Sequence, residues 1–438
     1  MRAFLGLRMD KNPKKKWLIL TQYYPPEMGA PQIRLRNFAR ELRKHGMNVS
    51  VLTAMPNYPL GKIFDEYTGR WSVHEEIDGI PVKRLWVYAC NARSGIARIA
   101  NYCSFALSAL SLLFAPRPDV LFVESQPLPL GLVALLMKWL RGVPYVYNVP
   151  DLQVDVARQL GFLRGPLLTL AFRFENLLLK SAWKVSTVTH AFVEHFVSRG
   201  VPATNVTFLP NGADTDFLKP QPPSTELLNR LQIHGKKVIV SVGTMAYYQA
   251  LDTIVEAAEQ LASEPEFVIL MVGDGPERAR IQELVRSKEL TNVLFPKVPY
   301  EESAELYSVA CAAIATFRNM AVARTMRPSK LFPALSCGVP VVFCGCGEAA
   351  ELVERNKCGI AVPPQDGIAL AQAIRKLASD NELRQRMGHN GRLLAEREYS
   401  WSGIVERWLS SVLPITATAE PAEMTKDVAL TTADSGES

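Results

Sequence analysis

The sequence predicts an α/β protein of two Rossmann-like, doubly wound domains that face each other across a cleft. Three observations predict this fold. Short apolar runs alternate with amphipathic helical patterns, this rhythm breaks in a proline-rich stretch at 219–224, and it starts again at 237. The 438 residues are enough for two or three domains, each with its own core.

The first half opens with one strand–helix–strand unit. Residues 17–21 are a short apolar run, typical of a strand that is buried on both faces. A turn at 24–30 follows, and Pro31 begins a helical pattern that ends at Gly46, as helix punctuation requires. Residues 48–53 are the next expected strand, so the unit predicts a parallel sheet with a right-handed crossover. Further strands of this half are expected at 119–123, 145–149 and 185–188.

The second half repeats the pattern after the break. A strand at 237–243 ends in a glycine turn, and a strand at 267–272 is followed by Gly273-Asp-Gly275. The other expected strands are 293–295, 312–317, 339–343 and 360–362, and the expected helices are 276–287, 301–309, 329–337, 348–355, 367–378, 381–397 and 401–412. We expect a flexible N-terminus at 1–14, a first domain at 15–208, a second domain at 209–398 and a disordered tail at 415–438.

Charge and cysteine usage narrow the class of protein. Residues 1–215 hold 26 Lys and Arg against 15 Asp and Glu, whereas the remainder is acidic. A basic half attracts phosphates or anionic lipid headgroups, and a well-solvated surface is the plain alternative. No recognition motif supports a nucleic-acid partner. Cys337, Cys344 and Cys346 cluster without a nearby histidine, so we interpret them as buried thiols of a cytoplasmic protein rather than a zinc site.

Two apolar stretches, 105–115 and 128–137, are the longest in the chain. Both are shorter than the ~18 residues that span a bilayer. Core helices are the favoured interpretation, and helices that lie in a membrane interface are the alternative. The apolar run near Met1 is too short for a secretory signal.

Glycine turns follow several of the expected strands. Gly29 precedes the first helix, while Gly243 with Thr244, and Gly273 with Gly275, follow strands of the second half. A glycine there lets backbone N–H groups approach a phosphate at a helix N-terminus, although each could equally be an ordinary turn. None of these turns has the spacing G-x-G-x-x-G, so a nicotinamide dinucleotide is not expected.

A group of cations stands before another expected helix. The segment 324–330 carries Arg324, Arg327 and Lys330 together with the hydroxyl of Ser329. Positive side chains and free N–H groups at a helix start suit a diphosphate, whereas an exposed basic loop is the alternative. We therefore predict that this segment binds an anionic ligand.

Other candidates come from the ends of further strands. Gly347, Glu348 and Ala349 open a helix, where N–H groups could meet a phosphate and the carboxylate could accept sugar hydroxyls. A glutamate is also favourable in the first turn of any helix. Asp151 follows the strand at 145–149 and is expected to face the cleft and meet an acceptor, and His190 follows another strand.

Six motifs occur in a characteristic order. They are TQYYPPEMGA at 21–30, VLTAMPNYP at 51–59, PNGAD at 210–214, VGDG at 272–275, PSK at 328–330 and CGVP at 337–340. Together they resemble the family 4 glycosyltransferases over about 17–412. The nearest likeness is to the bacterial branch that makes capsule, O-antigen and colanic acid, which includes the N-acetylfucosamine transferase of O-antigen assembly.

The resemblance implies a GT-B fold whose second domain holds a nucleoside-diphosphate sugar and whose first domain holds the acceptor. It also implies a final helix, 399–414, that returns to the first domain. Transfer in this family is generally retaining and needs no metal or other cofactor. The residues then expected to bind the donor are Gly29, Gly243, Thr244, Gly273, Ser329, Lys330, Gly347, Glu348 and Ala349, and those expected to act in catalysis are Lys330, Arg327 and Asp151.

The chain also departs from the family pattern. The Glu-x7-Glu pair of the family falls on Thr325 and Pro333, and its usual Arg and Lys after the first strand of the second domain fall on Thr244 and Gln249. Arg327 and Lys330 would then supply the charge, and Glu348 would bind the sugar. We interpret these differences as altered donor binding rather than as inactivity.

The resulting prediction is a transferase in cell-surface polysaccharide synthesis. It would move a hexose or N-acetylated deoxyhexose from the nucleotide donor to a polyprenyl-diphosphate-linked or oligosaccharide acceptor. Its expected place is the cytoplasm, with peripheral contact to the inner face of the membrane. A nucleotide-sugar epimerase on the same fold and a non-catalytic nucleotide-sugar-binding protein are the alternatives.

Overall fold

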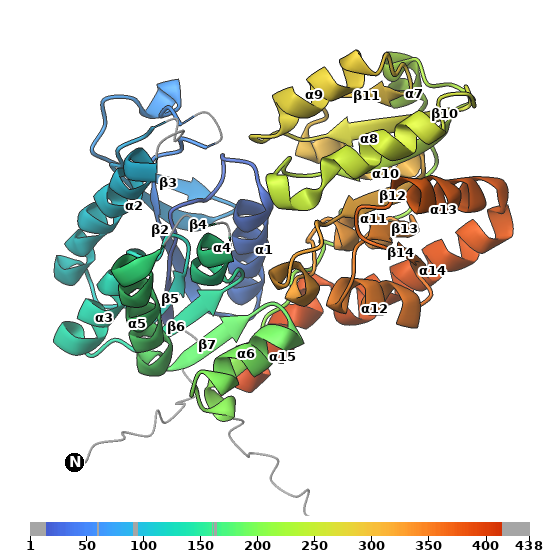
Figure 1. Cartoon of the computed structure of the whole chain (residues 1–438). Helices are drawn as coiled ribbons and strands as arrows, with labels where there is room; N and C mark the ends of the chain where they lie inside the picture. The colour runs from blue at the N-terminus through green and yellow to red at the C-terminus, as the bar shows by residue number, and fades with distance from the viewer. Residues whose placement is uncertain (1–14, 59–60, 91–94, 160, 162–163, 414–438) are drawn as a thin grey trace, which may run out of the picture.

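The computed structural model describes residues 15–58, 61–90, 95–159, 161 and 164–413. The expected flexible N-terminus and the expected tail at 415–438 lie outside these residues. The described chain folds into two domains, and each is a sheet with helices on both faces (Figure 1).

The sheet of the first domain has eight strands in the order β3-β4-β2-β1-β5-β6-β7-β8. Every neighbouring pair is parallel except β3 and β4, which form an antiparallel hairpin at one edge. Strands β5 and β6 are buried at every position, which explains why their sequences are apolar apart from Glu124 and Asn148. The strands are β1 (Lys16–Leu20), β2 (Asn48–Ala54), β3 (Ser72–Ile77), β4 (Ile80–Leu85), β5 (Val120–Glu124), β6 (Tyr145–Val149), β7 (Lys184–Thr187) and β8 (Val206–Phe208).

Two sets of helices sandwich this sheet. One face is covered by α2, α3, α5 and α6, whose apolar side chains join one buried cluster with the strands. The other face is covered by α1 and by α15, a helix from the far end of the chain. The helices are α1 (Ala30–Lys44), α2 (Gly95–Ala109), the 3-10 turn η2 (Leu110–Phe114), α3 (Leu130–Arg141), α4 (Gln153–Gln159), α5 (Gly165–Ser181) and α6 (His190–Ser198).

The second domain repeats this plan with six strands, all parallel, in the order β11-β10-β9-β12-β13-β14. Helices α8, α9 and α13 pack on one face, and α7, α10, α11, α12 and α14 pack on the other. The strands are β9 (Lys237–Val242), β10 (Phe267–Val272), β11 (Val293–Leu294), β12 (Ala310–Thr316), β13 (Val341–Cys344) and β14 (Gly359–Val362). The helices are α7 (Thr225–Leu231), α8 (Leu251–Gln260), α9 (Arg278–Ser287), α10 (Ser303–Ser308), α11 (Leu331–Ser336), α12 (Glu348–Arg355), α13 (Gly367–Ser379) and α14 (Asn381–Glu398).

The chain passes between the domains twice, at 209–224 and at 399–401, and the two passages are bonded together. The N–H of Ala213 donates to the carbonyl of Tyr399 (2.9 Å), and the N–H of Trp401 donates to the carbonyl of Ala213 (3.2 Å). After the second passage α15 (Trp401–Val412) packs on the first domain, where the Trp408 ring lies among Trp17, Phe38 and Phe122.

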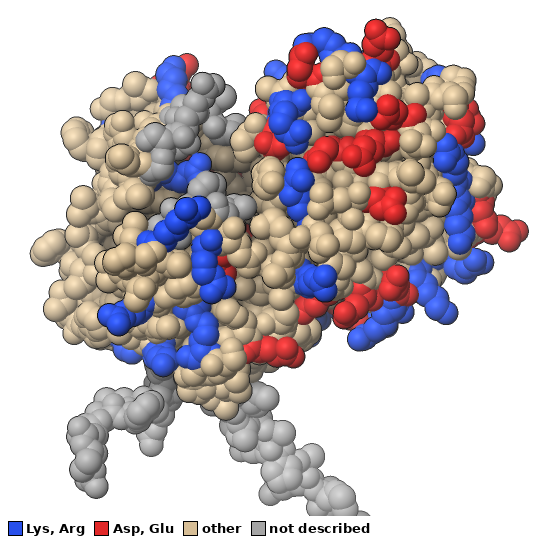
Figure 2. Space-filling view, in the orientation of Figure 1, with Lys and Arg blue, Asp and Glu red and all other residues tan. Residues whose placement is uncertain are grey.

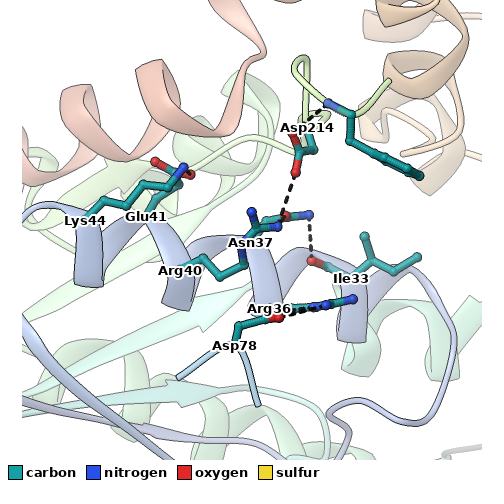
Figure 3. A network of polar contacts seen from close by, with 9 residues as sticks. Ile33, Arg36, Asn37, Arg40, Glu41, Lys44, Asp78 and Asp214 are labelled. Carbon is teal, nitrogen blue, oxygen red and sulfur yellow. Dashed lines mark hydrogen bonds and ion pairs between the residues drawn. The ribbon is translucent and has the colours of Figure 1, made fainter. Parts of the chain in front are cut away.

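Helix α1 is bonded to the first passage as well as to its own domain. Arg40 pairs with Asp214 in that passage (3.3 Å), and Arg36 pairs with Asp78 in the β3–β4 turn (2.6 Å), as Figure 3 shows. Glu41 and Lys44 form a third pair on the same helix. These partly exposed pairs orient α1 rather than stabilise it strongly.

Most expected elements are present within one or two residues of their expected limits, but the β3–β4 hairpin and β8 were not expected. Helix α11 begins at Leu331 and is only six residues long, so it is shorter than the expected helix at 329–337.

Candidate active site between the two domains

Loops that follow strands in the two domains meet at the interface. Tyr58, after β2, lies close enough to Thr244, which follows β9, for the Thr244 side chain to act on the pKa of the Tyr58 hydroxyl. Burial, together with the nearby Asp151 carboxylate from the first domain, raises the pKa of Tyr248 to about 12. Figure 2 shows the surface notched between the domains. The ligand-binding edges of two parallel sheets therefore face each other.

Backbone packing explains the glycines after β9 and β10. The N–H of Gly243 donates to the carbonyl of Val272 (2.9 Å), and Met245 donates to Asp274 (2.8 Å). A Cβ on Gly273, at φ +135°, would lie 2.0 Å from the carbonyl oxygen of Gly243. The space beside Gly273 is therefore filled by the neighbouring loop. Only the backbone groups of Gly273 are therefore left to meet a phosphate, and its part in donor binding stays a prediction.

Lys330 lies at this edge of the second sheet. Its Nζ donates to Oε1 of Gln249 (2.6 Å), and a Cβ on Gly243 would contact its Cε at 3.4 Å. Burial lowers the pKa of Lys330 to about 8. No carboxylate of the described chain pairs with this ammonium, so its only bonded side chain is a neutral amide. A half-buried cation with a neutral partner favours the approach of an anion.

Arg327 and Glu348 join the domains. The guanidinium of Arg327 donates to the hydroxyl of Tyr399 (2.8 Å) and to the carbonyl of Val188 (3.2 Å), in the first domain. Its Nε lies 3.0 Å from Oε2 of Glu348, an ion pair without hydrogen-bond geometry. Oε1 of Glu348 accepts from the N–H of Ala191 (2.9 Å), at the start of α6.

These contacts correct two expectations. Arg327 is 8% exposed and also lies over the rings of Phe208 and Tyr399, so its donors are engaged by protein groups rather than turned to a diphosphate. Glu348 caps α6 and balances Arg327, so it is not a free carboxylate for sugar hydroxyls. We therefore assign Arg327 and Glu348 to the contact between the two domains.

The other expected donor residues are placed as follows. Gly347, at φ +79°, precedes α12, and a Cβ there would lie 2.0 Å from the carbonyl oxygen of Arg324. The side chain of Ala349 is fully buried, so only its backbone N–H could meet a ligand. Ser329 is half-buried beside Lys330. Gly29 has an extended backbone and precedes α1 in the first domain.

A buried polar network lies at the facing edge of the first sheet. Arg34 of α1 donates to Oδ1 of Asn148 (2.8 Å) and pairs with Glu124 (3.4 Å), and Asn148 donates to Glu124 (2.7 Å). Asp151 accepts from the Gln126 amide (2.8 Å), and burial raises its pKa. Of these residues only Asp151 was expected to lie in the site. The other four were not expected, although Glu124 and Asn148 are polar residues near the ends of apolar strands, which was a usable signal.

Glu27 connects two loops of this edge. Its carboxylate accepts from the N–H groups of Asn57 (2.7 Å), Tyr58 (2.8 Å) and Tyr24 (3.3 Å). Burial raises the pKa of Glu27 to about 7, although these bonds act in the opposite direction. Glu27 therefore positions Tyr58, which lies near Thr244 across the interface.

The positions where the chain departs from the family pattern contact the same groups. Thr244 lies near Tyr58, and Gln249 accepts a hydrogen bond from Lys330. The hydroxyl of Thr325 donates to the carbonyl of Val322, and Pro333 lies within α11. Within the described residues no group of three His, Cys, Asp or Glu is arranged to hold a metal ion. His190 stacks on Phe208 at 4.4 Å between ring centroids.

Known proteins resemble the whole of this two-domain unit. The family described as Glycosyl transferase 4-like domain matches residues 29–212, and the one described as Glycosyl transferases group 1 matches residues 224–394. The chain is 27% identical over 412 residues to the glycosyl transferase WcaI of Escherichia coli (strain K12), which is assigned to colanic acid biosynthesis. That match covers 84% of this chain and 98% of WcaI.

Two further similarities cover most of the chain. The 2-deoxystreptamine N-acetyl-D-glucosaminyltransferase of Streptomyces fradiae is 24% identical over 370 residues, which cover 81% of this chain and 84% of that enzyme. The crystal structure of HepE from Anabaena in complex with UDP-glucose has a TM-score of 0.69 at 18% identity, over 91% of this chain and 99% of HepE.

Proposed function

Because the chain belongs to the family 4 glycosyltransferases of the GT-B fold, and is a sugar-transferring enzyme of glycan biosynthesis, we propose its substrates and the residue that serves the reaction. The donor is a nucleoside-diphosphate hexose or N-acetylated deoxyhexose. The acceptor is a sugar on a polyprenyl diphosphate or an oligosaccharide in cell-surface polysaccharide synthesis. The enzyme works at the cytoplasmic face of the membrane, and the transfer retains the anomeric configuration without a metal or other cofactor.

The observation that carries the proposal is the half-buried Lys330, whose ammonium has a neutral amide as its bonded partner. It lies where the loops after the central strands of the second sheet meet, and among the described residues its bonded partner is Gln249 rather than a carboxylate. A diphosphate there would supply the missing counter-charge. The names of WcaI and of the Streptomyces enzyme support the sugar and polysaccharide class, and the HepE complex supports a nucleotide sugar.

In the proposed reaction the second domain stabilises the leaving group and the first domain orients the acceptor. The acceptor oxygen bonds to the anomeric carbon while the bond from that carbon to the diphosphate oxygen breaks. The acceptor proton passes to the phosphate of the leaving group, and Lys330 stabilises the negative charge that develops on it. Asp151, across the interface and bonded to Gln126, orients the acceptor hydroxyl.

Calorimetric titration with UDP, GDP and dTDP tests this assignment. We expect one nucleotide to bind wild-type protein, and we expect Lys330→Ala to weaken that binding at least about tenfold, since one charge-assisted bond is lost. Lys376→Ala, on the exposed surface of α13, is the matched control and should bind like wild type. Unchanged affinity and turnover in Lys330→Ala would refute the role of this lysine.

A transfer assay separates this function from the alternatives. Donor labelled in the sugar should pass its label into an organic-extractable lipid or an oligosaccharide only when acceptor is present. An epimerase would convert the donor without acceptor, and the matching transferase families do not favour that activity. If the protein bound nucleotide but transferred sugar to no acceptor, it would be a non-catalytic binding protein.

A further inference from the structure

Three neighbouring helices of the first domain expose apolar stripes. On α2 and η2 the exposed side chains include Ile96 (83%), Leu107 (67%) and Phe114 (90%). Ile96, Ile99 and Leu107 lie on one side of the helix, because their spacing follows its period. Soluble helices place polar residues on that side, so the outward stripe of α2 is the reverse of the usual pattern.

The same reversal occurs on α3 and α5. Trp139 and Leu140 are exposed on α3, and Leu167, Leu170 and Leu177 are exposed along α5. The inward sides of both helices are also apolar and join the core of the first sheet. Helices α2, α3 and α5 lie side by side in that order, so their outward stripes form one continuous surface (Figure 1). We call the exposed side of α2, η2, α3 and α5 the α2–α3–α5 face.

The charges around this face have one sign. The segments 95–114, 130–141 and 165–181 contain the bases Arg98, Lys138, Arg141, Arg173 and Lys180. Their one acid is Glu175, which is buried and pairs with Arg199 at 2.6 Å. Figure 2 shows the flank that carries these helices as largely uncharged, with blue groups and few red ones. An apolar surface edged by cations is complementary to a bilayer with anionic headgroups.

We propose that the α2–α3–α5 face docks the protein on an anionic phospholipid bilayer. The inference deepens the proposed function and rests on it only for the lipid-linked acceptor. Trp139 beside Lys138 and Arg141 suits the interface between headgroups and acyl chains, where indole rings and long cations are enriched. A second copy of the chain would instead bring two basic surfaces together without a carboxylate to offset them.

Helix α2 lies on the bilayer and does not cross it. The run Ile96–Phe114 has the length and composition of a membrane span, but 28% of it is buried inside the protein. Phe105 and Ala109 belong to the core of the first sheet. Asn101 is buried and accepts from the Gln22 amide (2.6 Å), in the loop after β1. Insertion would strip these groups from the domain.

The same contact links the face to the active site. Because Asn101 meets the loop after β1, the first turns of α2 lie at the sheet edge that faces the second domain. Ile96 and Ile99 are exposed on those turns. A docked domain therefore holds its acceptor edge near the headgroups, where the diphosphate sugar of a lipid-linked acceptor would lie.

Flotation with vesicles of phosphatidylethanolamine and phosphatidylglycerol, compared with phosphatidylcholine alone, tests the proposal. We expect the full chain to float with the anionic vesicles and to be released in part by salt. The triple variant Leu107→Glu, Trp139→Glu and Leu170→Glu should lose about tenfold or more in vesicle affinity, since each change removes apolar contact and adds a repelled charge. Its melting temperature should hold because all three side chains are exposed.

The matched control is Ile368→Glu with Leu393→Glu, two exposed apolar residues of the second domain, and it should float like wild type. Wild-type protein that ignores both vesicle types, or a triple variant that floats equally well, would overturn the proposal. The proposal would also be overturned if the wild-type protein were a dimer and the triple variant a monomer, because the α2–α3–α5 face would then pack against a second copy of the chain. The vesicles contain neither donor nor acceptor, so vesicle binding is measured independently of sugar transfer.

Discussion

At the scale of single residues, Lys330 shows how a neutral neighbour changes the chemistry of a cation. Its ammonium is partly buried against the Gln249 amide, and this burial lowers its pKa to about 8. A carboxylate partner would have raised that pKa instead. The protein thus holds a cation whose charge is costly until an anion arrives, which favours a diphosphate over the empty state.

The depressed pKa predicts the pH dependence of nucleotide binding. Below pH 8 Lys330 is protonated and the affinity should be constant, whereas above pH 8 it should fall by about tenfold per pH unit as the ammonium is lost. Lys330→Arg keeps its charge in this range, so its affinity should be flat from pH 7 to 10. Titration calorimetry checks both profiles, and a wild-type profile that is equally flat would contradict the assignment.

Gly273 allows a second prediction at this scale. Gly273→Ala places a Cβ 2.0 Å from the Gly243 carbonyl oxygen at a positive φ, so it should cost roughly 2–4 kcal/mol of unfolding free energy. Gly235→Ala is the control, since its φ is +69° but nothing lies within 4 Å, and it should cost about 1 kcal/mol. Equal midpoints in urea for the two variants would show that the loop simply moves aside.

At the scale of elements, α15 belongs to the first domain although it follows the second. Its Trp408 contacts three aromatic rings of that domain, and its Nε1 donates to the hydroxyl of Ser186 (2.8 Å). Ser186 also shares a hydrogen bond with Thr207, so its hydroxyl has a second partner besides the indole. The ring contacts therefore contribute more to the fold than the hydrogen bond does.

This difference predicts the effects of two substitutions. Trp408→Phe should cost about 1 kcal/mol from the hydrogen bond, with a further small loss from the smaller ring. Trp408→Ala should cost roughly 3–5 kcal/mol, because it leaves a cavity between α15, α1 and the first sheet. Urea unfolding followed by tryptophan fluorescence measures both. A loss in Trp408→Ala no larger than that in Trp408→Phe would mean that α15 is not part of this core.

Strands that are apolar at nearly every position were predictable, and a strand made mostly of polar residues was not. Strands β6 and β10 are apolar at nearly every position, and the sequence located both with their observed limits. Strand β3 alternates exposed polar residues with half-buried ones, and only Val73 and Ile77 are apolar, so its composition resembled that of a loop. The Asp78-Gly79 turn between β3 and β4, with both φ values positive, was the missed signal for a hairpin.

At the scale of the whole molecule, the roles of Arg327 and Glu348 depend on contacts that sequence spacing does not reveal. Val188 is 139 residues from Arg327, and Ala191 is 157 residues from Glu348. The sequence placed a cation and a carboxylate correctly at the edge of the second sheet, but their partners belong to the first domain. Lys330 and Asp151 could be named as candidates because each follows directly from its own local pattern.

The contact between the domains predicts that Arg327 and Lys330 fail in different ways. Arg327→Met removes the bonds to Val188 and Tyr399 and leaves Glu348 without its cation, so it should cost roughly 3 kcal/mol and let the domains move apart. Nucleotide affinity should stay within about threefold of wild type, because in our proposal Lys330, and not Arg327, holds the diphosphate. Turnover should fall, because donor and acceptor edges no longer stay aligned.

Small-angle scattering, calorimetry and turnover measured on one preparation test this difference. Arg327→Met should show a larger radius of gyration with near-normal nucleotide binding, and adding Glu348→Gln should restore part of the stability, since it removes the unpaired charge. Lys330→Ala should show the opposite pattern, with wild-type scattering and weak nucleotide binding. If Arg327→Met instead loses nucleotide binding while its scattering and melting temperature are unchanged, Arg327 is a donor ligand after all, and the contact with Glu348 opens when the nucleotide binds.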